Sequence, residues 1–367
     1  MRRTARLVGI AVALCLVPTL ILNAAREAPV AETSVGKVQL MSAGQLTFGP
    51  NGVLFVGDST GGSIVAIETG DMKAGASAAG IDIQGIDQKV AALLGTAADQ
   101  VMINDVTVNP TSKNVYLSVS RGRGPDAAAV IVRADNSGQL SVVSLDNVKH
   151  TTVSLSDAPA SNTAARQNPR TQTVTDMQYV NGNLVIAGLS NEEWSSALRS
   201  IPYPFKQAER GTTLQIWHAS HGQYETAAPV RTFVPYTIQG QQYILAAYTC
   251  TPLVKIPVSD LKPGAKVKGV TIADLGSGNQ PLDMVPYAKD GHNYILVANS
   301  SHGTMKLKAD NLETYKPIES PTVVDVAGVP FDRIPAIKSV RHLAQYDASH
   351  ALVLTSAPAN LQTVALP

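Results

Sequence analysis

The sequence predicts an all-β protein and, within that class, a six-bladed β-propeller. Most of the chain reads as short β-rich runs divided by Gly, Pro, Asn and Asp, which is typical of sandwiches, barrels and propellers. A degenerate unit of three such runs recurs six times, at spacings of 51 to 71 residues. Internal repeats of about this size favour a propeller. Two β-sandwiches whose strands resemble one another by chance are the alternative fold.

Each unit contributes three recognisable strands. The first strands read GQLTF, NDVTV, TDMQY, RTFVP, LDMVP and RHLAQ. The second strands read VLFVGD, NVYLSV, NLVIAG, YILAAY, YILVAN and ALVLTS. The third strands read SIVAI, AVIVR, TLQIW, LVKIP, TMKLK and LQTVA. Six such units predict six blades, each a four-stranded antiparallel sheet.

The two ends of the chain predict how the ring closes. The sixth unit ends at Pro367, directly after its third strand. The segment KVQLM, residues 37–41, precedes the first unit and is predicted to supply the missing outer strand. Pairing of this N-terminal strand with the C-terminal blade would protect the sheet edges. Helical periodicity is confined to residues 86–94 and 192–201.

Composition excludes several classes of protein. The chain has 367 residues, of which 44% are hydrophobic, so it can bury a large core and is not a disordered chain. Its 29 basic and 28 acidic residues give a net charge of +1. This balance argues against a nucleic-acid partner. We expect one propeller domain over residues 32–367.

The N-terminus predicts export. Residues 1–31 combine Arg2, Arg3 and Arg6 with an apolar run over residues 7–22, and small residues follow it. This order is typical of a cleaved signal peptide, with an uncleaved N-terminal anchor as the alternative. The expected location is the periplasm or the extracellular space, with no other membrane association. Cys250 is then the only cysteine of the mature chain, which excludes an internal disulfide.

Propeller geometry brings the second residue of each first strand to one mouth of the central channel. These residues are Gln45, Asp105, Asp176, Thr232, Asp283 and His342. Converging carboxylates repel one another, so they either take up protons or hold a cation. Asp105, Asp176, Asp283 and His342 are therefore the predicted ligands of a divalent metal, with Ca²⁺ first and Zn²⁺ or Mn²⁺ as further choices. The alternative is that each Asp only hydrogen-bonds a neighbouring blade.

The turns between second and third strands are expected around the same mouth. They carry the predicted substrate-binding residues Arg121, Trp194, Tyr248, Asn299 and His302. The third turn, residues 190–211, is the longest and is predicted to be a helical insertion. Its aromatic residues Trp194, Tyr203 and Phe205 suggest a lid, or a decoration packed on a neighbouring blade.

Two further motifs carry candidate chemistry. Cys250 is interpreted as an inert thiol, with a nucleophile pair or a soft-metal site beside His302 as the alternative. His218 and His221, in the sequence HASH, have a metal-like spacing. They follow a segment assigned as a third strand, so they are predicted to be solvated on the opposite face.

The first unit also carries a family resemblance. LTFGPNGVLFVGDSTGGSIVAI, residues 46–67, resembles blades of NHL-type propellers and of the gluconolactonase and senescence-marker-protein superfamily. That resemblance implies a central divalent metal at the inner strand starts and hydrolysis of lactones or organophosphate esters. Asp105, Asp176 and Asp283 occupy the comparable places here.

The functional prediction follows from the ring and the resemblance together. The protein is expected to bind a small molecule at the channel mouth and, with a metal, to hydrolyse a lactone or ester. Asp105, Asp176 and Asp283 are the predicted catalytic residues, one of them as general base. A non-enzymatic exported scaffold that binds a protein partner at the same mouth is the alternative.

Overall fold

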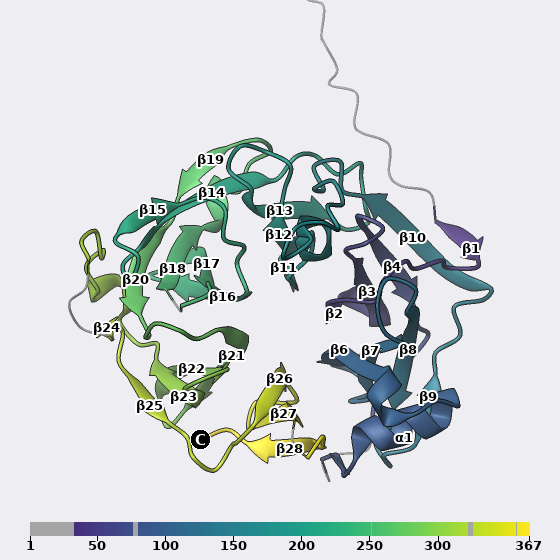
Figure 1. Cartoon of the computed structure of the whole chain (residues 1–367). Helices are drawn as coiled ribbons and strands as arrows, with labels where there is room; N and C mark the ends of the chain where they lie inside the picture. Colours follow the sequence, from purple (N-terminus) through teal and green to yellow (C-terminus); the bar gives the residue numbers. More distant parts are fainter. Residues whose placement is uncertain (1–32, 76–79, 251, 322–325, 357) are drawn as a thin grey trace, which may run out of the picture.

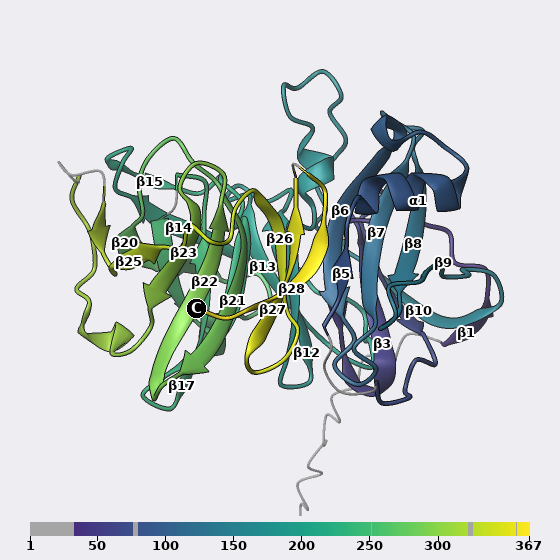
Figure 2. The ribbon, with the colours of Figure 1, turned by 90° about the horizontal axis from the view of Figure 1, so that it is seen from below.

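The protein is a six-bladed β-propeller in the computed structural model, which describes residues 33–75, 80–250, 252–321, 326–356 and 358–367. Six mainly antiparallel sheets are arranged in a ring (Figure 1). Seen from below, the strands of each blade run between the two faces of the ring (Figure 2). The predicted signal peptide lies outside the described residues. Among the residues described, no helix has the length and apolar character needed to cross a bilayer.

Blades are numbered by the order of their inner strands in the sequence. Blade one contains β2 (Leu46–Phe48), β3 (Val53–Asp58), β4 (Ser63–Glu68), β10 (Val148–Ser154) and β1 (Ser34–Gly36). Blade two contains β6 (Val101–Val108), β7 (Val115–Arg121), β8 (Ala128–Ala134) and β9 (Leu140–Val142). Blade three contains β11 (Asp176–Val180), β12 (Asn183–Leu189), β13 (Ser196–Pro202), β14 (Thr212–His218), β15 (Gln223–Glu225) and β19 (Lys266–Lys268).

The remaining blades follow the same plan. Blade four contains β16 (Thr232–Ile238), β17 (Gln241–Ala247), β18 (Pro252–Pro257), β20 (Val270–Asp274) and β24 (Ala327–Gly328). Blade five contains β21 (Pro281–Lys289), β22 (His292–Asn299), β23 (Gly303–Lys308) and β25 (Phe331–Arg333). Blade six contains β26 (Val340–Gln345), β27 (His350–Thr355), β28 (Leu361–Ala365) and β5 (Asp82–Ile83). The helices are α1 (Ile86–Leu94), η1 (Pro50–Gly52), η2 (Ala98–Gln100), η3 (Pro169–Gln172), η4 (Val258–Asp260) and η5 (Leu312–Thr314).

The blades do not follow one another around the ring in sequence order. The inner strands are neighbours in the order β2, β6, β26, β21, β16, β11 and back to β2 (Figure 1). Blade two therefore lies between blades one and six, and blade one lies between blades two and three. The apolar core consists of clusters between adjacent blades and follows the same order. One cluster joins Leu117 of blade two to Leu354 of blade six, and another joins Phe55 of blade one to Ile186 of blade three.

Two chain-distant strands complete the ring, and the predicted closure was wrong in this detail. Ile83 of β5 pairs with Leu361 of β28, so a segment that follows blade one in the sequence supplies the outer strand of blade six. Similarly, β10 pairs with β4 and completes blade one after the chain has built blade two. Residues 37–41, the predicted closing segment, form no strand, and the strand β1 that precedes them pairs with β10 on blade one. Backbone hydrogen bonds to a sheet edge do not depend on side-chain identity. The residue pattern therefore could not show which segment pairs with which blade.

The predicted helical insertion over residues 190–211 was also wrong. Its centre is the strand β13, which pairs with β12 along its whole length and then with β14. TLQIW therefore belongs to the fourth strand of blade three and not to the third. The Phe205 side chain has 0% exposure, and its ring lies 5.6 Å from that of Phe55 on blade one. Burial between two blades has overridden the helical periodicity, and this segment is core. The other predicted helix, Ile86–Leu94, is present as α1.

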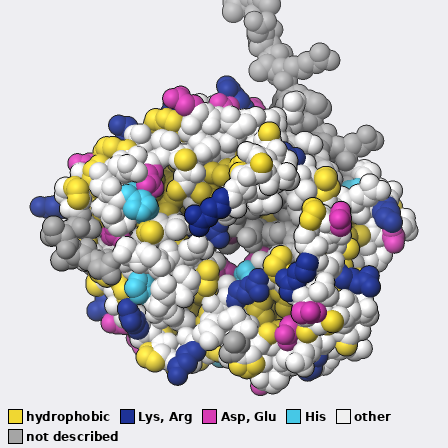
Figure 3. Space-filling model, viewed as in Figure 1, with side chains coloured by type: hydrophobic (Ala, Val, Ile, Leu, Met, Phe, Trp, Pro, Cys, Tyr) yellow, Lys and Arg dark blue, Asp and Glu magenta, His cyan; other side chains and the backbone are white. Residues whose placement is uncertain are grey.

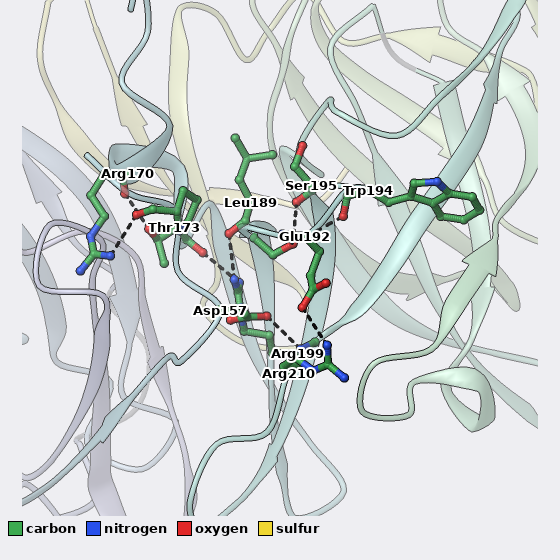
Figure 4. A network of polar contacts seen from close by, with 12 residues as sticks. Asp157, Arg170, Thr173, Leu189, Glu192, Trp194, Ser195, Arg199 and Arg210 are labelled. Atoms are coloured by element: carbon green, nitrogen blue, oxygen red, sulfur yellow. Dashed lines mark hydrogen bonds and ion pairs between the residues drawn. The ribbon is translucent and has the colours of Figure 1, made fainter. Parts of the chain in front are cut away.

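A buried ion pair anchors the long connector between β10 and β11 (Figure 4). Nε of Arg199, on β13, lies 2.7 Å from Oδ1 of Asp157. The same guanidinium donates to the carbonyl oxygens of Thr173 and Leu189. The connector therefore sends a charged side chain, that of Asp157, into the core.

Candidate functional site

The structure brings all six residues of the predicted ring into one central cavity. The cavity has a volume of about 630 Å³. Its lining includes Gln45, Asp105, Asp176, Thr232, Asp283 and His342. Each comes from a different inner strand or, for Gln45, from the residue before it, and Asp105 lies midway along β6, so the six blades converge on one site.

Irregular pairing directs several of these side chains. The register between the first two strands of a blade shifts between Ile103 and Asp105, between Pro281 and Asp283, and between Val340 and His342. Such bulges re-aim a side chain and are frequent beside functional sites. The extra residue at each bulge is Asn104, Leu282 or Arg341, and all three also line the cavity.

Each aspartate of the ring also joins its blade to the next one. One carboxylate oxygen of each accepts a hydrogen bond from a backbone N–H of the neighbouring inner strand. The three bonds are Leu46 N to Asp105 Oδ2 (2.7 Å), Phe233 N to Asp176 Oδ2 (2.7 Å) and Leu343 N to Asp283 Oδ2 (3.0 Å). The interblade hydrogen bonds that the sequence left as an alternative are therefore present. The second oxygens of Asp176 and Asp283 accept the backbone N–H groups of Met177 and Met284.

The cavity shifts the pKa values of these groups because it removes them from bulk water. Burial raises the pKa of Asp105 to about 8. The hydrogen bond from Leu46 opposes this rise, and the charge of Asp176 adds to it. Burial raises the pKa of Asp176 to about 7, although the hydrogen bond from Phe233 opposes it. Burial, followed by the charges of Asp105 and Asp176, raises the pKa of Asp283 well above its usual value. Near neutral pH the ring holds protons unless a cation replaces them.

Three of the four predicted metal ligands form a close cluster. One ligand atom from each of Asp105, Asp283 and His342 lies within 4.8 Å of the others. Nδ1 of His342 is 3.5 Å from Oδ1 of Asp105. The other ring nitrogen, Nε2, is buried with no hydrogen-bond partner among the described residues. Burial and the charge of Arg341 lower the pKa of His342 to about 3, which keeps the imidazole neutral, the form that binds metals.

The donor atoms of this cluster suit a divalent cation. Two carboxyl groups and a neutral imidazole are donors that Zn²⁺ and Mn²⁺ accept. The unpartnered Nε2 of His342 is the polar atom that a cation would satisfy. Asp176 lies outside the cluster. Both of its oxygens accept backbone hydrogen bonds, from Met177 and Phe233.

Two arginines that the sequence did not single out also line the cavity. Arg231 and Arg341 directly precede Thr232 and His342. Neither forms an ion pair with any residue that the structure describes, and Nε of Arg231 is buried without a hydrogen-bond partner. Burial lowers the pKa of Arg231, and burial with the nearby charge of Arg123 lowers that of Arg341. Lys and Arg side chains gather around the channel opening on the face that Figure 3 shows. The sequence signal for Arg231 and Arg341 was their position directly before two residues of the ring.

The five residues predicted to bind substrate lie outside this lining. Arg121 is exposed at the end of β7, and Nζ of Lys266 lies 5.0 Å from the centre of the Trp194 ring. Tyr248 is fully buried in the core between blades three and four. Asn299 accepts hydrogen bonds from the backbone N–H groups of Ser301 and His302, so it shapes a turn.

Comparison with known proteins finds only distant likenesses among solved structures. No protein-family model matches the sequence, and no curated protein matches it. Among solved structures, a glucose dehydrogenase is 13% identical with a TM-score of 0.36, covering 92% of this chain and 100% of its own. A soluble aldose sugar dehydrogenase from Escherichia coli is 12% identical with a TM-score of 0.33, covering 91% and 98%. A chain of a mitotic checkpoint complex is 10% identical with a TM-score of 0.39, covering 96% and 99%. Likenesses of this size assign no activity or ligand to this chain.

Proposed function

We propose that the protein binds an acidic small molecule in its central cavity, beside a divalent cation. The observation that carries the proposal is the composition of that one cavity. Arg231 and Arg341, which form no ion pair with any described residue, line it together with the carboxyl–imidazole cluster of Asp105, Asp283 and His342. A cation at the cluster would neutralise the acids and leave the arginines to attract an anion.

The arginines define the class of ligand. A guanidinium group offers several N–H donors in a plane and pairs best with carboxylate or phosphate oxygens. Nε of Arg231 is buried and has no hydrogen-bond partner in the described parts of the chain, so it has lost its hydration before a ligand arrives. An anion that reaches it gains a charge-assisted hydrogen bond at little further cost.

Asp105, Asp283 and His342 would hold the cation, and the imidazole donor favours Zn²⁺ or Mn²⁺ over the Ca²⁺ that we expected first. When bound, such an ion polarises a carbonyl group, as hydrolysis of an ester or lactone requires. Asp176 lies beside the cluster with a pKa of about 7, which suits a residue that takes a proton from water near neutral pH. We therefore propose ester or lactone hydrolysis as the activity, with Asp176 as the base.

The interblade hydrogen bonds favour a second candidate function. All three aspartates bond to a neighbouring strand, so they can serve to hold the ring closed. In that case the cavity binds its ligand without catalysis, and the protein is an exported binding protein or a scaffold. Export itself remains a proposal that rests on the N-terminal sequence pattern.

Calorimetric titration with Zn²⁺, Mn²⁺ and Ca²⁺ tests the cation. We expect one ion per chain in the cavity, lost in Asp283→Asn and His342→Gln and kept in Asp126→Asn, which removes an exposed acid. A panel of lactones and aryl esters, with and without a free carboxylate, then tests the activity. Turnover of the carboxylate-bearing compounds that disappears in Asp176→Asn supports hydrolysis. Cation binding without turnover supports the binding-protein candidate, and no cation binding leaves the ring as a purely structural element.

A further inference from the structure

A second group of metal-binding side chains lies away from the central cavity. His218 ends β14, His221 lies in the turn to β15, and Cys250 lies in the turn between β17 and β18. One ligand atom from each of the three lies within 4.8 Å of the others. None of them lines the cavity. The group joins blade three to blade four, and in Figure 3 histidine and acidic side chains lie side by side over this sector of the ring.

One carboxylate holds both imidazoles in a defined orientation. Nδ1 of His218 is 2.6 Å from Oε2 of Glu225, and Nδ1 of His221 is 2.6 Å from Oε1 of the same group. A carboxylate only accepts, so both Nδ1 atoms donate, and each Nε2 keeps a lone pair. The rings lie against each other with centroids 3.8 Å apart. Metal-binding histidines are oriented in this way by an outer carboxylate in many proteins.

The environment of His218 Nε2 is a second, independent observation that favours a metal ion at this group. The His218 side chain is only 2% exposed. Its Nε2 is buried and has no hydrogen-bond partner among the residues that the structure describes. A polar atom withdrawn from water without a partner is unfavourable by roughly 1–3 kcal/mol. A metal ion beside Nε2 would remove that penalty.

Cys250 completes the set from the neighbouring blade. It is a free thiol that is partly exposed. Its φ of 60° places it in the left-handed region, where a residue other than glycine is uncommon. The bond from its backbone N–H to the carbonyl oxygen of Asn279, 2.8 Å long, holds the turn in this conformation. The strained backbone is therefore fixed where the thiol is near the two histidines.

We propose that His218, His221 and Cys250 bind Zn²⁺ through two imidazole nitrogens and one thiolate. Three protein ligands leave a fourth position of a tetrahedral ion for water or a ligand. In a tetrahedral zinc site the donors lie roughly 3.3 to 3.6 Å apart, so these must approach by about 1 Å. His221 and Cys250 lie in turns that can make this adjustment. His221 is 46% exposed, which gives the ion a route from solvent.

Cobalt absorption spectroscopy tests the site on the reduced full-length protein. Co²⁺ bound to a thiolate gives a near-ultraviolet charge-transfer band that a cation in the cavity, with only oxygen and nitrogen donors, cannot give. We expect this band at one Co²⁺ per chain, removed by one equivalent of Zn²⁺. Cys250→Ser should abolish the band, and His221→Gln should weaken Co²⁺ binding at least about 100-fold. Glu225→Gln should weaken it about 10- to 100-fold, because the imidazoles lose their orientation.

His292→Gln is the matched control, since His292 also bonds a carboxylate, that of Asp310, but lies outside the group. It should bind Co²⁺ as the wild type does. Both Cys250 and His221 lie at the surface, so circular dichroism of these variants should match that of the wild type. The absence of a thiolate–cobalt band in the wild type would overturn the proposal. So would Zn²⁺ affinity in Cys250→Ser equal to that of the unchanged protein.

Discussion

Arg199 and Asp157 form an ion pair in the core of the propeller, with Nε 2.7 Å from Oδ1 and both side chains 1% exposed. Oδ2 of Asp157 accepts a further bond from the backbone N–H of Gly211, so the carboxylate uses both oxygens. The pair joins the connector after blade one to the third strand of blade three. The connector runs from blade one to blade three, which are adjacent in the ring but not consecutive in the sequence. The ion pair therefore helps to hold these two blades side by side.

Loss of one partner of this pair should destabilise the fold strongly. Arg199→Met leaves the Asp157 carboxylate buried without its counterion, and such changes cost about 3–5 kcal/mol. Urea denaturation should show a midpoint well below that of the wild type. Lys149→Gln is the control, since it breaks the exposed pair of Lys149 with Glu68 and should change the midpoint little. Equal midpoints for both variants would contradict a structural role for the buried pair.

Stability should fall as pH rises from about 4 to about 8 when no metal is present. In the folded protein the pKa of Asp105 is about 8 and that of Asp176 about 7, whereas an unfolded Asp titrates near pH 3.9. Between these values each aspartate binds more protons in the folded state than in the unfolded state, so stability falls as pH rises. The raised pKa of Asp283 adds to the decline, and the lowered pKa of His342 offsets part of it below about pH 6.5. Melting temperatures in chelator should show this decline. Asp105→Asn should flatten it, and a decline just as steep in that variant would argue against a raised pKa.

Residues around Phe205 should behave as core and not as a lid. Phe205 is fully buried, with its ring 5.2 Å from that of Tyr203. Phe205→Ala should lower the free energy of unfolding by about 3–5 kcal/mol. Trp194→Ala removes a half-buried side chain from the same segment and should have a much smaller effect. Thermal denaturation compares the two, and a larger loss from Trp194→Ala would contradict this packing.

Arg231 should favour ligand binding at the expense of stability. Arg231→Leu removes a half-buried cation that has no acidic partner among the described residues, so the melting temperature should stay the same or rise. Binding of carboxylate ligands to the cavity should be lost, while neutral analogues are unaffected. Calorimetry with matched acid and amide ligands measures this. A marked drop in melting temperature would show that Arg231 is part of the structural framework.

Local patterns in the sequence were sufficient for the elements that depend on them. Helix α1 has the predicted bounds Ile86–Leu94 because its apolar residues recur with helical spacing and face the core. The six residues of the predicted ring line one cavity, since every blade presents its first strand to the centre of the propeller. These features repeat along the chain, so they can be read without knowing which blades are neighbours.

Tertiary structure alone decided which segments meet. Strands β5 and β10 join blades far from them in sequence through backbone hydrogen bonds, which leave little trace in residue type. The segment Ser196–Pro202 became strand β13 because burial between β12 and β14 outweighed its helical periodicity. Because β13 is the third strand of blade three, β14 is the fourth, and its end lies on the face of the ring where His218 is close to Cys250 of blade four. The sequence determined the repeating unit and the acids at the channel, whereas long-range pairing of backbone edges decided the order of the blades and the contacts between them.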